Sequence, residues 1–511
     1  MPNRGVQGWR GEWRGVWLGI AMMTIAAAPA LGAEAPAQKR DEFFWLGEIN
    51  KATAVINTEE GLLDRAAAPR IAAGLRQVLE AGARPGGKRP ATVISFEPLL
   101  IEAGGVEATL LHAGRSSQDM HATYRAAILR EETLAVAAAL NRTTTAMLRL
   151  AETHRETVVP NYTNGVAAQP NSYGHYLLGH IAGLLRDGER LREAYARLDR
   201  SPMGTTVLNG TGWPLNRRRM ADYLGFPALV DNAYDASQIS SAEMPVELGG
   251  VITGIALHAG AFIEDVLVQY AQSRPWILLQ EGGGNTYVSS AMPQKRNPGL
   301  LNDTRTQASA LLGMAAGRVF QAHNIPPGMP DPKGVRENGA MMAAAVQVLR
   351  GWERILGALA ISPDRALEEL NGDWTASQEL ADALMRDHGL PFRVGHHFAS
   401  AVVDFARERD IRPSDFPYAE ARRIYAETVR HEMPGQDEAL PLSEAGFRAA
   451  LDPRAIVRGR ATSGGPQPAE MTRMLDGATQ AVTAQESWIA GRRGAINSAL
   501  ARLDADFAKL R

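Results

Sequence analysis

The longest uninterrupted helical pattern in this chain runs from Asp119 to Glu152. Apolar residues recur there at helical spacing, Ala and Leu are abundant, and neither Pro nor Gly interrupts the pattern. The pattern predicts one long helix. A helix of this length needs partners of similar length to cover its apolar positions, so it points to a helical bundle.

Four more segments of the chain carry long helical patterns. They are residues 173–198, 236–273, 303–322 and 335–359. Five long helices in the middle of a chain predict a bundle whose members pack inside a subunit or against other subunits. Aromatic residues make up only 6% and no strand-like alternation is found, so we expect an all-α protein.

The 511 residues are enough for several domains. Residues 34–118 alternate short helical patterns with turns and predict an N-terminal helical domain. Residues 119–375 hold the long helices and predict the central bundle domain. Residues 376–511, with Pro391 and further prolines beyond it, predict a smaller C-terminal domain of shorter helices.

The first 33 residues have the build of a secretory signal peptide. Three arginines precede an apolar run that begins at Gly15, and small residues end at Ala33. The alternative is a retained membrane anchor, but the apolar run is short for a span. We therefore expect an exported, periplasmic protein. No later segment looks apolar enough to cross a bilayer, so no membrane contact is expected after cleavage.

Composition excludes several kinds of partner. The formal net charge is −2, so no basic field suggests nucleic acid. There is no cysteine, which excludes disulfides and zinc-finger sites. The histidines have no carboxylate cluster beside them, and we expect neither a metal nor a cofactor.

The densest group of chemically useful residues is Ser289, Ser290, Lys295 and Asn297. They follow the glycine run 282–284 and precede a long helical pattern, so a movable loop carries them to a helix mouth. Two hydroxyls, an ammonium and an amide in this arrangement favour proton transfer and anion binding.

Two further segments accompany this loop: residues 112–119, at the start of the longest helix, and residues 162–170. Together the three segments resemble the signature regions of the fumarase/aspartase superfamily, and the Met-Pro-Gln-Lys loop is similar to that of argininosuccinate lyases. The likeness runs from about residue 43 to about 475. It implies an all-helical subunit of three domains, and a homotetramer in which three subunits contribute to each site.

The resemblance also implies roles for single residues. Ser289 matches the catalytic base, and Lys295 is the cation beside it. The family positions that bind the carboxylates of a succinyl group are occupied here by Ser116, Gln118 and Thr163. Three further residues are candidates for substrate binding. Those three are Arg115, Ser290 and Asn297.

The pattern departs from the family at the second segment. The family has a Thr-His pair where this chain has Thr163-Asn164, and the glutamate partner of that histidine is replaced by Asn302. Asparagine can orient a water or a carboxylate, and Asn164 is therefore assigned to substrate binding, but it cannot shuttle a proton. Residues 323–331 also replace a polar run of the argininosuccinate lyases. The succinyl half of the site is thus expected to be intact and the amine half altered.

The leading hypothesis is a carbon–nitrogen lyase similar to argininosuccinate lyase, which eliminates an amine from an N-substituted aspartate to release fumarate. One alternative is a lyase for another N-(dicarboxyethyl) amine. Another is a non-catalytic relative that only binds dicarboxylates. All three take a small-molecule dicarboxylate as ligand.

Overall fold

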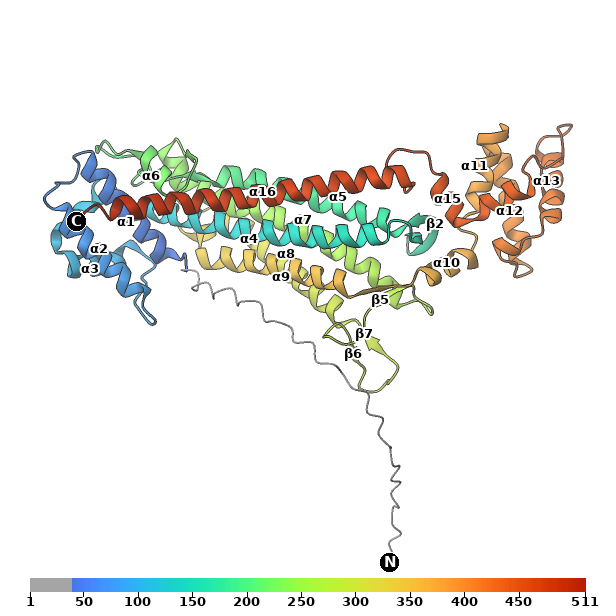
Figure 1. The fold of residues 1–511 in the computed structure, drawn as a ribbon, viewed down its shortest axis with the longest axis horizontal. Helices are drawn as coiled ribbons and strands as arrows, with labels where there is room; N and C mark the ends of the chain where they lie inside the picture. Colours follow the sequence, from blue (N-terminus) through green and yellow to red (C-terminus); the bar gives the residue numbers. More distant parts are fainter. Residues whose placement is uncertain (1–38) are drawn as a thin grey trace, which may run out of the picture. The chain divides into compact units, whose positions relative to one another are not determined.

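The computed structural model describes residues 39–511. The predicted signal peptide lies outside the described residues, so its prediction stays a prediction. Helices dominate the described residues, and the all-α class is confirmed (Figure 1).

Five long helices form the bundle, as the sequence predicts. They are α4 (Ser117–Thr153), α5 (Tyr173–Leu198), α7 (Ser240–Tyr270), α8 (Gly299–Ala322) and α9 (Val335–Ala358). Their core is continuous. Ile255 and Phe262 of α7 are fully buried, and Phe262 contacts the fully buried Trp352 of α9 with ring centroids 5.6 Å apart. Side chains two helical turns apart on α7 thus share one buried face.

The last helix departs from the predicted domain boundary. Helix α16 (Pro468–Phe507) runs back along the bundle, and the C-terminus lies beside α1 and α2 (Figure 1). Its first half adds Met471 and Leu475 to the bundle core, and its second half adds Leu503 and Phe507 to the core of the N-terminal domain. The predicted C-terminal domain 376–511 is therefore too long, because an apolar stripe along α16 is buried by distant helices.

The N-terminal domain has its own apolar core around Trp45 and Leu46. Its elements are α1 (Glu42–Glu59), α2 (Ala68–Ala83), α3 (Val93–Gly104) and the 3-10 helix η1 (Val106–His112). The small C-terminal core is built around Phe398, Phe416 and Phe447. Its surroundings comprise α10 (Pro363–Gly372), α11 (Ser377–His388), α12 (Phe392–Arg407), η4 (Pro413–Asp415), α13 (Tyr418–Glu432), α14 (Glu444–Leu451) and α15 (Pro453–Gly459).

Short strands occur where the sequence analysis found none. The longest pair is the antiparallel hairpin β1 (Val158–Thr163) and β2 (Val166–Ser172). Three smaller two-stranded sheets join β3 (Arg200–Ser201) to β4 (Ala228–Leu229), β5 (Ile277–Leu279) to β8 (Leu359–Ile361), and β6 (Tyr287–Val288) to β7 (Arg296–Asn297). The three smaller pairs are too short to show a period-two pattern. Strands β1 and β2 are long enough, but burial changes from one end of each strand to the other and does not alternate, so the sequence shows no period of two there.

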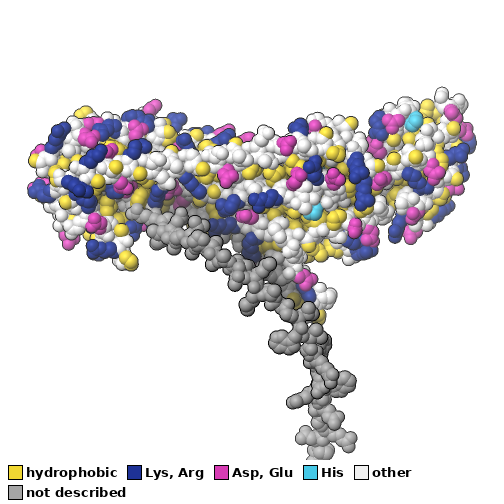
Figure 2. Space-filling model, in the orientation of Figure 1, with side chains coloured by type: hydrophobic (Ala, Val, Ile, Leu, Met, Phe, Trp, Pro, Cys, Tyr) yellow, Lys and Arg dark blue, Asp and Glu magenta, His cyan; other side chains and the backbone are white. Residues whose placement is uncertain are grey.

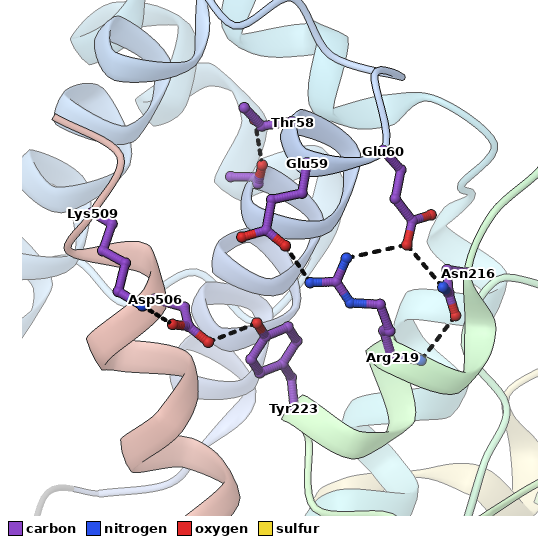
Figure 3. Close-up of polar contacts among 9 residues, drawn as sticks. Thr58, Glu59, Glu60, Asn216, Arg219, Tyr223, Asp506 and Lys509 are labelled. Atoms are coloured by element: carbon purple, nitrogen blue, oxygen red, sulfur yellow. Dashed lines mark hydrogen bonds and ion pairs between the residues drawn. The ribbon is translucent and has the colours of Figure 1, made fainter.

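A polar network ties helix α6 (Arg217–Tyr223) to the end of α1 and to α16 (Figure 3). Arg219 pairs with Glu59 and Glu60 at the end of α1. Tyr223 donates a 2.8 Å hydrogen bond to Asp506 of α16. These contacts hold the loop before α6 in place, and that loop contacts the start of α4.

The helix α7, together with the short π-helix η2 (Asp235–Ile239) before it, is long and apolar enough to cross a membrane. The expectation that no later segment has this property is wrong on composition. The segment packs in the bundle, but only 39% of its most apolar window is buried within the subunit, and Leu257 is 56% exposed. Charged side chains of both signs are mixed over the face shown in Figure 2.

Candidate active site

The first predicted site segment forms the start of α4. Ser116 is the N-cap residue: its Oγ accepts a hydrogen bond from the backbone N–H of Gln118 at 3.3 Å. In return, Asp119 Oδ1 accepts from the backbone N–H of Ser116 at 2.9 Å, which completes a capping box. The Ser116 hydroxyl proton and the half-buried Gln118 amide remain available to a ligand.

Arg115 makes internal contacts in this segment. Its guanidinium is buried, and Nη1 donates 3.0 Å hydrogen bonds to Asn50 Oδ1 and Thr53 Oγ1 of α1. Burial lowers the pKa of Arg115 to about 10. Substrate binding by Arg115 stays a prediction, and the contacts of the subunit give it the task of holding α1 against the first site segment.

Asp119 fixes this segment to the loop before α6. It is fully buried, and its Oδ2 accepts hydrogen bonds from the backbone N–H groups of Gly204 at 3.1 Å and Thr206 at 3.0 Å. Thr206 in turn donates from Oγ1 to the carbonyl of Gly114 at 2.9 Å. The sequence marked Asp119 only as part of a helix start and missed this second role.

The second segment is the turn of the β1–β2 hairpin. Thr163 pairs with Val166, and the two residues between them, Asn164 and Gly165, have φ angles of 54° and 77°. Two consecutive left-handed residues make a type I′ turn, for which Asn-Gly is the preferred pair. Thr163 and Asn164 are exposed and line a cleft of about 420 Å³. Asn164 thus has a role in the turn, and its role in substrate binding stays a prediction.

The third segment is the tip between β6 and β7. The Oγ of Ser289 accepts hydrogen bonds from the backbone N–H groups of Ala291 at 3.4 Å and Met292 at 3.3 Å. The backbone N–H of Ser289 itself donates to the carbonyl of Lys295 at 3.3 Å, which closes the tip. Two amide dipoles directed at one hydroxyl favour its ionised form.

The other polar residues of this tip face solvent in the subunit. Ser290 and Lys295 are exposed, and Asn297 makes only a long 3.5 Å hydrogen bond to the carbonyl of Tyr287. Helix α8 begins at Gly299 without a side-chain cap, so its positive end lies next to these groups. The arrangement suits a carboxylate.

The three segments do not meet within one subunit. Helix α4 has 37 residues, and a helix of that length extends roughly 55 Å. Ser116 precedes it and the Thr163 hairpin follows it, so the two lie at opposite ends of the bundle (Figure 1). One succinyl group cannot reach both. The predicted site therefore requires residues from more than one subunit.

A buried lysine near the first segment was missed. Lys333, at the end of the 3-10 helix η3 (Asp331–Lys333), is 2% exposed and donates to Gln238 Oε1 at 3.0 Å and the carbonyl of Ser237 at 3.2 Å. Gln238 Oε1 also accepts from the backbone N–H of Gly328 at 2.8 Å. Gly328 faces the Gln118 amide, so residues 323–331 do lie against the site segment.

Burial without a carboxylate partner lowers the pKa of Lys333 to about 8. The signal available in the sequence was the altered run 323–331, but nothing there indicated that Lys333 is buried. Across residues 39–511, no group of three or more His, Asp or Glu side chains is arranged to hold a metal ion.

The sequence of this chain matches known protein families. The family described as "Lyase" matches residues 94–313, and the family described as "Argininosuccinate lyase C-terminal" matches residues 374–458. The argininosuccinate lyase of Methanothrix thermoacetophila is 29% identical over 91% of this chain and 93% of its own length. The chain belongs to the fumarase/aspartase superfamily.

Further relatives and solved structures are also similar to this chain. The argininosuccinate lyase of Geobacillus thermodenitrificans is 28% identical over 82% of this chain and 88% of its own length. The crystal structure of EDDS lyase in complex with formate has a TM-score of 0.80 and 26% identity, covering 92% of each chain. A class II fumarase from Schistosoma mansoni shares the fold alone, with a TM-score of 0.61 and 15% identity over 82% of this chain and 90% of its own.

These matches confirm the predicted superfamily, the fold class and the prediction of a carbon–nitrogen lyase that releases fumarate. The roles of individual site residues stay predictions.

Proposed function

We propose that this protein is an exported, homotetrameric lyase that splits an N-substituted aspartate into fumarate and an amine, with Ser289 as the base. The observation that carries the proposal is the contact of Ser289 Oγ with the backbone N–H groups of Ala291 and Met292. A serine hydroxyl is too weak an acid to ionise alone at neutral pH, and these dipoles, with Lys295 on the same tip, lower that cost.

The chemistry follows from the superfamily reaction. Ser289 removes a proton from the carbon next to a carboxylate, and that carboxylate then carries a second negative charge. Lys295, Asn297 and the start of α8 stabilise this charge. The electron pair then forms the double bond of fumarate as the carbon–nitrogen bond breaks, and the amine takes up a proton.

The side chains at the positions of the family's proton-transferring pair cannot supply that last proton, because Asn164 and Asn302 are both amides. Water or the amine itself must do so. This makes a substrate whose amine leaves readily more suitable than one that needs a protein acid. Argininosuccinate is the default candidate, and another N-(dicarboxyethyl) amine is the alternative.

A tetramer is supported by surface that one subunit leaves uncovered. Tyr287 and Val288 beside the catalytic tip are each 57% exposed, and Phe320 on α8 is 78% exposed. Large apolar side chains at such positions are typical of surface that another protein covers. Export is supported by the pattern of residues 1–33, and N-terminal sequencing of the protein from a periplasmic fraction tests it.

The test of the activity is fumarate release, followed by ultraviolet absorbance, from argininosuccinate and from other N-(dicarboxyethyl) amines. We expect Ser289→Ala to lower the rate at least ~100-fold. Ser309→Ala is the matched control, because Ser309 is an exposed serine on α8 that donates only to the carbonyl of Arg305. Equal rates for Ser289→Ala and the parent would remove Ser289 as the base.

A binding protein without activity is the second candidate. It predicts no fumarate from any of these substrates, together with a higher melting temperature in the presence of succinate or fumarate. Fumarate release that depends on Ser289 excludes it.

A further inference from the structure

The cleft beside Thr163 and Asn164 has one carboxylate and no cation. Its volume is about 420 Å³, within the range of small-molecule sites. Asp265 of α7 is the only charged side chain among the described residues that line it, and these include no Lys or Arg. An unneutralised carboxylate in a concave site attracts positive charge.

Asp265 is held in position but not neutralised. Its Oδ2 accepts a 2.8 Å hydrogen bond from the Tyr176 hydroxyl, and within residues 39–511 it forms no ion pair. Burial, together with the nearby Asp265, raises the pKa of Tyr176 well above its usual value, so the phenol stays a neutral donor. The other oxygen of the Asp265 carboxylate is left for a ligand.

Aromatic side chains make up much of the rest of the cleft wall. They are Tyr162, Tyr173, Tyr176 and Trp276. Tyr and Trp rings attract ammonium and guanidinium groups through their π faces, so their presence beside a carboxylate adds to the preference for an organic cation.

A buried hydroxyl in the wall has no partner. Tyr173 is 2% exposed, and its hydroxyl makes no hydrogen bond to any described residue. It also lies close enough to Asp265 for that charge to raise its pKa, after burial, which is the larger cause. A buried polar group without a partner is uncommon and suggests that a ligand or water completes it.

Negative charge also lies behind the wall. The Tyr162 hydroxyl donates to Glu369 Oε1 at 2.5 Å and accepts hydrogen bonds of 2.9 Å from Gln269 and Trp276. These contacts fix the Tyr162 ring and leave a second carboxylate, Glu369, outside the cleft. Carboxylates therefore lie on two sides of the aromatic wall, and they favour a cationic ligand.

We propose that this cleft binds the cationic part of the amine that leaves the substrate, with Asp265 as its counter-ion. The inference rests on the proposed function, since Thr163 and Asn164 of the predicted site line the same cleft. The cleft would select substrates whose amine portion carries an ammonium or guanidinium group. An amine portion with a net negative charge is disfavoured, because Asp265 repels it.

The test is calorimetric titration of the intact oligomer with agmatine. This ligand carries a guanidinium and an ammonium group and has no carboxylate. We expect agmatine to bind the parent, and Asp265→Asn to weaken binding by about tenfold or more, the scale of one charge-assisted contact. Tyr173→Phe keeps the ring and should weaken binding to a lesser degree. Higher ionic strength should also weaken it, because Asp265 is exposed to solvent.

The matched control is Glu264→Gln. Glu264 is the neighbouring exposed carboxylate on α7 but does not line the cleft, so agmatine affinity should stay at the parental value. Succinate binding should be retained in Asp265→Asn, which shows that the variant is folded. Absence of agmatine binding to the parent, or equal binding to Asp265→Asn, overturns the cation site.

Kinetics separate this inference from the proposed function. In Asp265→Asn, kcat/KM for argininosuccinate should fall, while kcat/KM for N-(1,2-dicarboxyethyl)glycine, whose amine portion is anionic, should not. If agmatine binds through Asp265 but no substrate yields fumarate, the lyase proposal fails and the cation site stands. If fumarate is released and the two substrates respond equally to Asp265→Asn, the cleft assignment fails and the lyase stands.

Discussion

The Oδ2 atom of Asp119 accepts a 3.0 Å hydrogen bond from the backbone N–H of Thr206, across 87 residues of sequence. Its Oδ1 atom accepts from the backbone N–H of Ser116 at 2.9 Å. One buried carboxylate therefore caps the longest site helix and anchors the loop that packs against it. Ser116 and Gln118 depend on this residue for their position.

Replacement of Asp119 tests that dependence. Asp119→Ala leaves several buried backbone N–H groups without acceptors, and we expect a loss of about 2–4 kcal/mol in the free energy of unfolding. Ser116→Ala should lose only about 1 kcal/mol, since it removes one cap contact. Urea denaturation measures both. Equal losses for the two variants would show that the contacts with Gly204 and Thr206 contribute nothing.

The buried Lys333 should give the protein a pH-dependent stability. Its folded pKa is about 8 against an ordinary value of 10.5, so between these values the unfolded chain binds more protons. Stability contributed through this group therefore rises as pH increases from about 8 to 10.5 and is constant below pH 7, where the cost of the buried charge is fully present.

Lys333→Met isolates this contribution. Between pH 8 and 10.5, the urea midpoint of the parent should rise relative to the midpoint of the variant as the pH increases. A difference that stays flat over this range would mean that Lys333 keeps its ordinary pKa in the folded protein.

The proposed tetramer, in which subunits share each site, predicts complementation between variants. Gln118→Ala and Ser289→Ala should each be nearly inactive alone. If three subunits supply each site, a randomly mixed tetramer of the two variants has about one site in four with both residues intact, because two subunits must each be of the right kind. Fumarate release should then recover to roughly a quarter of the parental rate. No recovery in verified mixed oligomers would place both residues in one subunit.

The Asn-Gly turn of the hairpin can be probed with a pair of glycines. Gly165 has a φ of 77°, and Gly165→Ala should destabilise the protein by about 1 kcal/mol and lower kcat/KM, because a side chain is strained there. Gly179 lies on α5 with no atom near its missing Cβ, and Gly179→Ala should stabilise by about 0.5–1 kcal/mol. Thermal melting with activity assays measures both, and a neutral Gly165→Ala would exclude a strained turn.

The sequence alone determined the local features. The absence of Pro and Gly between Asp119 and Glu152 was sufficient for a long helix, and helical periodicity located the other bundle helices. The loop residues Ser289 and Lys295 and the family resemblance needed no coordinates. Each of these depends on residues that are neighbours in the chain or one helical turn apart, where spacing and residue type carry the information.

The tertiary structure decided what depends on distant neighbours. It docked α16 along the bundle, turned the Arg115 guanidinium toward α1, and buried Lys333 without a carboxylate partner. It also separated Ser116 from Thr163 by the length of α4, so these two residues of one subunit cannot bind the same small ligand. The reason is that the burial of a side chain depends on surfaces that meet only after the helices pack. Burial in turn sets the charge state of the side chain and its hydrogen-bond partners, so neither can be read from residue spacing along the chain.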